Sequence, residues 1–300
     1  MEAGSQLIEP SVRAGGEQTV PEELIEVLQR GRKRRAGRLI RRIITYGVFP
    51  VVVVGLWWTS TAVGWVNPTL IPSPPTVVIS WYEWFFGSTT SANASIGTFA
   101  GTGFPSVWAS LQRVLIGFAS ASIVGAILGV LIGRFVFIRR LLDPTLQFLR
   151  PIPVTAWLPF AIVLFGIRDT SALFLVFLAA FFPVLLNTTG GVRGVPLNYI
   201  RAGQMLGASE SAILFRIVLR AALPSIMTGL RLALGYSWTS VIVAEMLAVK
   251  SGIGYVLWNS YSLFEVGYLG AAMVTIGLLG YLSDLLIRLL SKRLIFWSQT

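Results

Sequence analysis

Few ionisable side chains lie inside strongly apolar stretches of this sequence, and these are the first candidates for chemistry. Glu245 is the only acid well inside such a stretch, Arg231 lies in the same stretch, and Arg150 interrupts another. A lone carboxylate in this setting can carry a proton, pair with a basic neighbour or lie near the outer mouth of a pathway. A carrier driven by protons or sodium normally has several acids within its spans. The single acid therefore argues against ion coupling.

The chain contains neither cysteine nor histidine. This excludes disulfide bonds, thiol nucleophiles, zinc or haem sites built on these residues, and a Ser–His–Asp triad. An intramembrane enzyme needs a clustered set of acids, bases or metal ligands, for which the sequence has little material. We therefore predict a protein that is not itself an enzyme, with no catalytic residue and no metal site.

A phosphate-binding loop is also missing from the sequence. Such a loop needs a glycine-rich turn that ends in Lys-Ser or Lys-Thr. Lys250 is the only lysine that precedes a serine, and Ala244 and Val249 stand where glycines are required. We predict that the chain does not bind ATP in this way, so another chain or an ion gradient supplies the energy for any work.

Long apolar stretches must position these side chains, since hydrophobic residues make up 54% of the chain and charged residues only 12%. About 20 helical residues, at a rise of about 1.5 Å each, cross a hydrocarbon core of about 30 Å. Four uncharged runs approach or exceed this length: 43–65, 114–133, 170–192 and 266–283. Two further runs, 144–167 and 221–247, contain prolines or charges, which are tolerated where a helix faces protein or water. We expect an all-α polytopic membrane bundle of six transmembrane helices, in which the last two runs line a pathway.

Most of the 24 Lys and Arg residues fall on one side of such a six-span bundle. By the positive-inside rule this side is cytoplasmic, and both termini lie there. We interpret the net charge of +11 as a sign of topology and of contact with anionic membrane lipid. The basic run at 32–42 also suits nucleic acid, but it directly precedes the first span, so we expect no nucleic-acid partner.

The remaining segments suggest how the chain is organised. Residues 1–42 are polar and acid-rich, and we interpret them as a partly disordered cytoplasmic N-terminal extension ahead of a transmembrane domain at 43–295. The prolines of 67–78 predict an extended or turn-like chain, and the aromatic run 81–86 suits a membrane–water interface. Small residues at every fourth position over 117–133 predict close packing of that helix.

A polar-punctuated segment, 199–231, separates two apolar stretches but has a helical pattern of its own. Gly207 permits a sharp turn because it lacks a Cβ, and Ser209 is suited to cap the helix that follows. Pro224 is expected to end that helix. A pair of short helices with small residues at their turn is suited to enter a groove on another protein. An ordinary cytosolic helical loop is the alternative that stays open.

The same segment resembles the cytoplasmic coupling loop of ATP-binding-cassette importer permeases, whose motif is Glu-Ala-Ala-x3-Gly-x9-Ile-x-Leu-Pro. Four residues hold positions of this motif: Ala202, Gly207, Ile217 and Leu219. Three depart from it: Arg201 in place of Glu, Gly203 in place of the second Ala, and Arg220 in place of Pro. The stretches 110–118, 149–167 and 206–247 resemble the nitrate, sulfonate and taurine branch of this family.

This resemblance implies the fold of a type I importer permease, in a subunit of the bacterial cytoplasmic (inner) membrane that forms a homodimer. Its partners are expected to be two ATP-binding-cassette ATPase subunits, which bind ATP and magnesium, and an extracytoplasmic substrate-binding protein. The chain itself is expected to hold no cofactor. The substrate would be a small oxyanion or sulfonate, of the nitrate, taurine or alkanesulfonate class, moved by alternating access. Bicarbonate, cyanate and thiamine-precursor pyrimidines stay open, as does an ion-coupled secondary transporter, although no convincing internal repeat supports the last.

Two sets of site residues follow from the resemblance and from local chemistry. The coupling helices at about 197–220 and the residue positions around them are expected to contact the ATPase: Arg201, Ala202, Gly203, Gly207, Ala208, Ser209, Ile217, Leu219 and Pro224. Charged, amide, hydroxyl and aromatic side chains of spans three to five are expected to line the substrate pathway: Arg150, Thr155, Trp157, Asn187, Thr188, Ser237, Trp238, Thr239 and Glu245. Each member of the second set also suits packing or snorkelling, and that alternative stays open.

Overall fold

The structure is a computed structural model that describes residues 47–67, 69–87 and 99–294. The chain divides into two compact units, 1–59 and 60–300, and each is described by itself. The described residues of the first unit, 47–59, are helical. The N-terminal extension expected at 1–42 lies outside the described residues.

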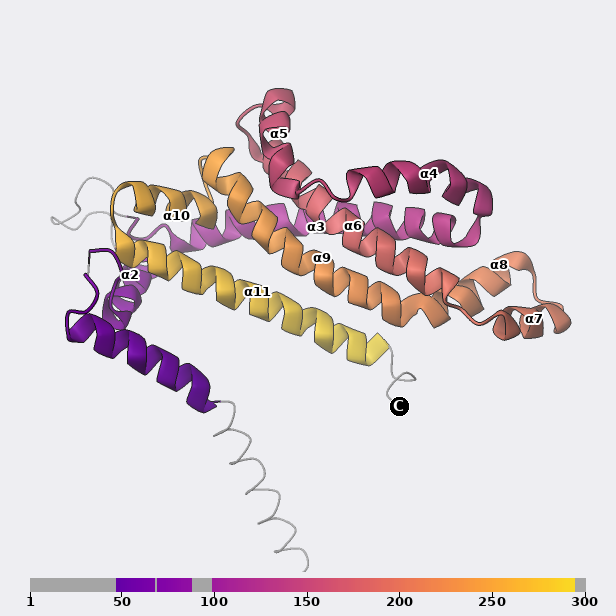
Figure 1. The fold of residues 1–300 in the computed structure, drawn as a ribbon, viewed down its shortest axis with the longest axis horizontal. Helices are drawn as coiled ribbons and strands as arrows, with labels where there is room; N and C mark the ends of the chain where they lie inside the picture. Colours follow the sequence, from indigo (N-terminus) through magenta and orange to yellow (C-terminus); the bar gives the residue numbers. More distant parts are fainter. Residues whose placement is uncertain (1–46, 68, 88–98, 295–300) are drawn as a thin grey trace, which may run out of the picture. The chain divides into compact units, whose positions relative to one another are not determined.

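Every regular element in the described part of the second unit is a helix, so the all-α prediction is confirmed (Figure 1). In chain order the elements are α2 (Pro74–Phe86), α3 (Gly103–Arg134), α4 (Val136–Leu149), the 3-10 segment η1 (Val154–Trp157), α5 (Leu158–Phe165), α6 (Asp169–Arg193), α7 (Leu197–Met205), α8 (Glu210–Ala212), the π-helical segment η2 (Ile213–Val218), α9 (Leu219–Leu247), α10 (Ile253–Ser262) and α11 (Val266–Leu294).

Four helical segments of the described residues are long and apolar enough to cross a membrane: Gly103–Arg134, Asp169–Arg193, Glu210–Leu247 and Val266–Leu294. A fifth is present if α4 and the η1–α5 segment, bent by 89° relative to each other, count as one broken span. Pro151 and Pro153 lie at this break, and they lack the N–H groups that a continuous helix needs. A shorter apolar helix, Gly47–Ala62, lies where the first span is expected. The described residues therefore contain four or five of the six expected spans, and this shorter helix.

The small-residue face of α3 packs against α6. A Cβ added to Gly129 would lie 2.7 Å from the Thr188 side chain, well inside van der Waals contact. A Cβ added to Gly117 or Gly133 would lie 2.6 or 2.7 Å from a valine side chain of α6. The backbones of the two helices can approach this far only because these positions have no side chain, as the spacing predicts.

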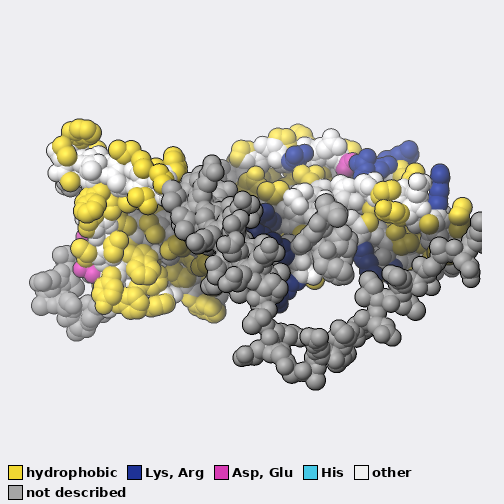
Figure 2. Space-filling view, turned by 90° about the horizontal axis from the view of Figure 1, so that it is seen from below, with side chains coloured by type: hydrophobic (Ala, Val, Ile, Leu, Met, Phe, Trp, Pro, Cys, Tyr) yellow, Lys and Arg dark blue, Asp and Glu magenta, His cyan; other side chains and the backbone are white. Residues whose placement is uncertain are grey.

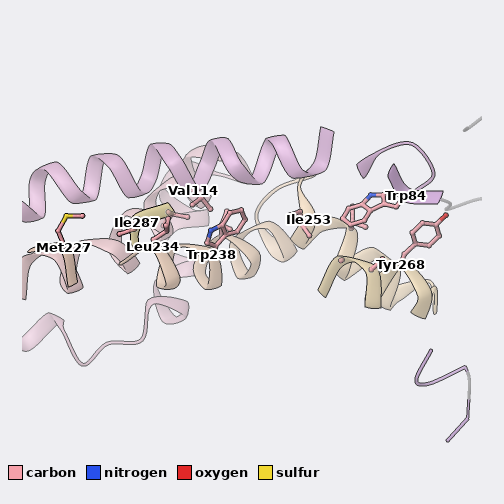
Figure 3. Close-up of a cluster of buried hydrophobic side chains, with 13 residues drawn as sticks. Trp84, Val114, Met227, Leu234, Trp238, Ile253, Tyr268 and Ile287 are labelled. Atoms are coloured by element: carbon pink, nitrogen blue, oxygen red, sulfur yellow. The ribbon is translucent and has the colours of Figure 1, made fainter. Parts of the chain in front are cut away.

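A cluster of buried hydrophobic side chains joins α9 to α2, α3, α10 and α11 (Figure 3). Trp238 of α9 lies in this cluster, and its Nε1 donates to the Ser283 hydroxyl of α11 at 3.0 Å. Trp84 of α2 is fully buried in the same cluster, although the aromatic run 81–86 is expected at the membrane interface. The cluster holds one face of α9 in place, so the side chains on its other face have defined positions.

Two predictions that rested on proline fail, one of them only in part. The described residues from 67 to 73 are turn-like or irregular, as expected, but α2 begins at Pro74 with Ser73 as its cap. Proline is tolerated in the first turn of a helix, where its missing N–H has no partner within the helix. Pro224 does not end a helix but lies inside α9. The π-helical segment η2 directly precedes α9, and such local adjustments allow a membrane helix to contain proline.

Candidate functional site

The expected coupling segment forms a compact helix–turn–helix at one end of the second unit (Figure 1). After α7 ends at Met205, Gly207 has a φ of +73°, in the left-handed region that a residue without a Cβ adopts most easily. The Gly207 N–H donates to Gln204 O and the Ala208 N–H donates to Gly203 O, each at 3.0 Å. These are the two hydrogen bonds of a Schellman turn with glycine just past the helix end. The sharp turn predicted at Gly207 is present.

Small and apolar side chains hold the two arms of this turn together. Gly203 is buried, and a Cβ there would lie 2.6 Å from the Ile217 side chain. Ser209 caps α8, as predicted, because its Oγ accepts a hydrogen bond from the Ala212 N–H at 3.3 Å. The turn therefore has a fixed shape.

The tip of the turn exposes apolar side chains. Met205 and Leu206 are each 87% exposed, and a Cβ at Gly207 would have no atom within 4 Å. An exposed apolar tip on a rigid turn is suited to bind a pocket on another protein. Two other expected coupling residues, Arg201 and Ala202, are exposed beside the tip. The remaining three lie in the helical segment that follows the turn: Ile217, Leu219 and Pro224.

The turn is joined directly to the apolar bundle. α8, η2 and α9 form one continuous helical segment, Glu210–Leu247, of 38 residues. At about 1.5 Å per residue this segment is about 57 Å long, so the turn and α9 belong to the same helical element.

Two of the expected pathway residues meet at a cavity. Arg150, at the end of α4, and Asn187 of α6 line an open cavity of about 330 Å³ together with Pro183, Leu232 and Tyr236. Among the described residues Arg150 has no ion-pair partner. A guanidinium with free N–H groups beside a cavity attracts anions and can bind the oxygens of a nitrate or sulfonate group.

The other expected pathway residues do not line this cavity. Three lie inside the helix packing: Thr188 against α3, Ser237 with its hydroxyl bonded to Ala233 O at 2.8 Å, and Trp238 in the hydrophobic cluster. Thr155 and Thr239 are exposed, and Trp157 is half-buried with its ring edge-on to two phenylalanines. For the buried side chains, the packing alternative is the one that the structure shows.

Glu245 forms a buried ion pair. Its Oε1 accepts from Nη1 of Arg113 in α3 at 2.6 Å, and its Oε2 accepts from the Ser110 hydroxyl at 2.8 Å and the Gly254 N–H at 3.0 Å. The carboxylate therefore binds the start of α10 to α3. Gly252 directly precedes α10, and a Cβ there would collide with the Glu245 carboxylate. Of the alternatives open for Glu245, pairing with a basic neighbour is the one that the structure shows.

Arg113 uses all five of its N–H groups in this network. Besides Glu245, it binds Oδ1 of Asp169 through Nε at 2.9 Å and Nη2 at 2.7 Å. It also binds the Ser251 carbonyl through Nη1 at 2.9 Å and the Ser251 hydroxyl through Nη2 at 2.6 Å. A buried guanidinium is tolerated when every donor is bonded. Arg113 does not figure in the sequence prediction, although it is a lone charge that directly precedes an apolar run.

A model of the family described as binding-protein-dependent transport system inner membrane component matches residues 121–296. This is more than half of the chain, and it contains the coupling turn, the cavity residues and Glu245. The chain belongs to this family. The permease is 40% identical to the nitrate import permease protein of Synechocystis over 65% of its own length and 71% of that protein. It is 32% identical to the taurine transport system permease protein of Escherichia coli, over 82% of its own length and 86% of that protein.

A solved structure has the same fold. The inward-facing MetNI methionine ABC transporter matches with a TM-score of 0.52 at 20% identity, over 63% of the permease and 93% of the matched chain. The resemblance to the nitrate, sulfonate and taurine branch of importer permeases is therefore confirmed. As a member of this family the permease is a membrane subunit and not itself an enzyme. ATP hydrolysis and substrate capture belong to separate chains.

Proposed function

We propose that two copies of the permease form a homodimer that binds two ATPase subunits. This assembly receives a small oxyanion or sulfonate, of the nitrate, taurine or alkanesulfonate class, from an extracytoplasmic binding protein. ATP and magnesium bind to the ATPase subunits, and the permease holds no cofactor. Both termini lie in the cytoplasm, and residues 43–295 form the transmembrane domain.

The observation that carries this proposal is the rigid, apolar-tipped turn at the end of the continuous Glu210–Leu247 helix. An ATPase subunit that binds Met205 and Leu206 moves α9 as a lever when ATP binding closes the ATPase dimer. α9 borders the Arg150 cavity through Leu232 and Tyr236, so the same motion changes access to that cavity. Docking and substrate access are thus linked through one helix.

The distribution of charge supports the orientation. Figure 2 shows Lys and Arg side chains from the middle toward the end with α7 and α8. Arg193, Arg201, Arg216 and Arg220 are all exposed around the coupling turn. By the positive-inside rule this end is the cytoplasmic one, where the ATPase subunits lie.

The substrate class is supported by Arg150 at the cavity, which has no ion-pair partner within the described residues. It is also supported by the oxyanion and the sulfonate that the related permeases are named for, nitrate and taurine. A cavity with a free guanidinium, an amide and a phenol favours a small anion with several acceptor oxygens.

A matched pair of variants at Gly207 tests the coupling role. Asparagine tolerates the left-handed conformation, whereas a β-branched residue is strongly disfavoured there. We expect Gly207→Val to weaken ATPase binding in co-purification from membranes by about 5–30-fold, since a strain of about 1–2 kcal/mol opposes the turn. Gly207→Asn is expected to retain binding. Unchanged co-purification and unchanged uptake in Gly207→Val would contradict a coupling role of this turn.

A further inference from the structure

Three charged side chains lie on an exposed face of α9 and α11, two helices that run side by side (Figure 1). Asp284 of α11 accepts from both Nε and Nη2 of Arg231 in α9, the latter at 3.0 Å. Asp284 also accepts from Nη2 of Arg288 at 2.6 Å. The side chains of Arg231, Asp284 and Arg288 are 47%, 30% and 45% exposed. These three residues are called the charge triad below.

The charge triad is net positive, because two guanidiniums share one carboxylate. Both of its helices are apolar enough to cross a membrane. Charged residues within spans normally face water or protein rather than lipid, and they mark substrate paths. The face of α9 and α11 that holds the triad is therefore not a lipid-facing surface.

An open hollow of about 490 Å³ lies at the triad. Its lining includes Thr228, Arg231, Tyr236 and Thr239 of α9, and Asp284 of α11. Within the part of the chain that the structure describes, Nη1 of Arg231 and the Tyr236 hydroxyl have no hydrogen-bond partner. These N–H and O–H groups are therefore available to donate to a ligand.

The hollow and the Arg150 cavity are neighbours along α9, because Leu232 and Tyr236 line both. A cationic group thus lies at each of two adjoining spaces, with the Tyr236 phenol at their common border. An anion that leaves one space meets the positive charge of the next, as multi-site conduction requires.

A purely structural role explains the triad less well. α9 and α11 are already joined by the Trp238–Ser283 hydrogen bond and by the buried hydrophobic cluster. An exposed ion pair adds little to stability. The surplus positive charge serves no packing purpose, but it is what an anion needs.

We propose that the charge triad is a binding station for a small oxyanion on the translocation path, next to the Arg150 cavity. This proposal rests on the proposed function, since it concerns the same path. Arg231 binds the anion through its free N–H groups, and Tyr236 donates its hydroxyl. Asp284 offsets part of the positive charge, so that the anion is held weakly enough to leave.

Two variants, one that removes a positive charge and one that removes a negative charge, test the station. They are compared in the purified permease–ATPase complex, without nucleotide or binding protein. Thermal unfolding is followed while nitrate or methanesulfonate replaces gluconate at constant ionic strength, because a ligand of the native state raises Tm. Arg231→Gln removes the cation and Asp284→Asn removes the carboxylate. A unit charge this close changes anion affinity by about 3–10-fold. We expect the apparent Kd to rise by this factor in Arg231→Gln and to fall in Asp284→Asn.

Two further variants complete the experiment. Lys292→Gln removes a positive charge from α11 at a position outside the hollow, and its Kd is expected to equal that of the wild type. Arg231→Lys keeps the charge, and it is expected to keep Kd within about 3-fold. If Arg231→Gln does not fold, the fall in Kd expected for Asp284→Asn tests the station.

A structural ion pair predicts a different pattern, in which either change lowers Tm without anion and neither alters Kd. Equal Kd values in the wild type, Arg231→Gln and Asp284→Asn overturn the binding station. If the complex imports substrate yet shows this equality, only the station fails. If the permease does not bind the ATPase at all, the proposed function fails first.

Discussion

Removing the negative charge of Glu245 is expected to destabilise the helix bundle strongly. In Glu245→Gln the side chain keeps its size, but its partners Arg113, Ser110 and Gly254 all donate to it. An amide offers one acceptor oxygen and one donor nitrogen, so its NH2 group must face at least one donor. The guanidinium of Arg113 also loses its buried counter-charge.

The size of this effect follows from burial. The Glu245 side chain is 0% exposed and that of Arg113 is 7% exposed. Removing one partner of a buried ion pair costs about 3–5 kcal/mol. In a domain of about 150–250 residues each kcal/mol lowers Tm by about 2–4 °C, so a fall of about 6–20 °C is expected.

The assay is thermal unfolding of the detergent-solubilised permease, followed by size-exclusion chromatography of the protein that stays folded. Glu210→Gln is the matched control, because Glu210 pairs with Arg134 at 3.0 Å but is 83% exposed. Its cost is expected to be at most about 1 kcal/mol. The double variant Arg113→Met/Glu245→Met should lose less stability than the two single changes together, since each single change leaves a buried charge unpaired.

One result would refute this reasoning. If Glu245→Gln unfolds at the same temperature as the wild type while uptake is lost, Glu245 acts on the substrate or on a coupled ion. Strictly additive losses in the double variant would also show that Arg113 and Glu245 do not stabilise each other.

Two further predictions concern the packing of α3 and the cavity. Gly129→Ala is expected to lower the unfolding free energy by about 1–3 kcal/mol, because the added methyl group overpacks against α6. Gly190→Ala is the control, since a Cβ there meets nothing within 4 Å, and it should be neutral in the same unfolding assay. A neutral Gly129→Ala would contradict the close approach of the two helices. Arg150→Gln is expected to slow anion uptake about 10-fold or more without changing ATPase co-purification, because it removes the charge-assisted bonds at the cavity. Arg140→Gln, on the same helix but outside the cavity lining, is its control, and equal uptake rates in the two variants would remove Arg150 from the path.

Much of the fold follows from local pattern. The uncharged runs at 114–133, 170–192 and 266–283 all lie in long helices, because a span needs only length and apolarity, which can be counted in the sequence. The coupling turn is predictable for a similar reason, since Gly207 and Ser209 act through their own backbone neighbourhood. Features that depend on residues close in sequence are the ones that sequence reasoning finds.

The rest depends on distant partners. α3 begins at Gly103, eleven residues before the uncharged run starts, and its Arg113 pairs with Glu245, 132 positions away. The charge triad joins residues 53 positions apart in the same way. Thr188 and Ser237 suit a polar pathway by residue type, but their burial is decided by which helix face meets α3 or the core. Side-chain chemistry alone does not indicate that face.

ATP-driven uptake by the reconstituted assembly tests the central claim most directly. Proteoliposomes would contain the permease with its ATPase, with the binding protein outside and labelled nitrate or taurine as substrate. We expect uptake only when all three proteins and internal ATP are present, and none with the permease alone under a proton or sodium gradient. Gradient-driven uptake by the permease alone would contradict the account.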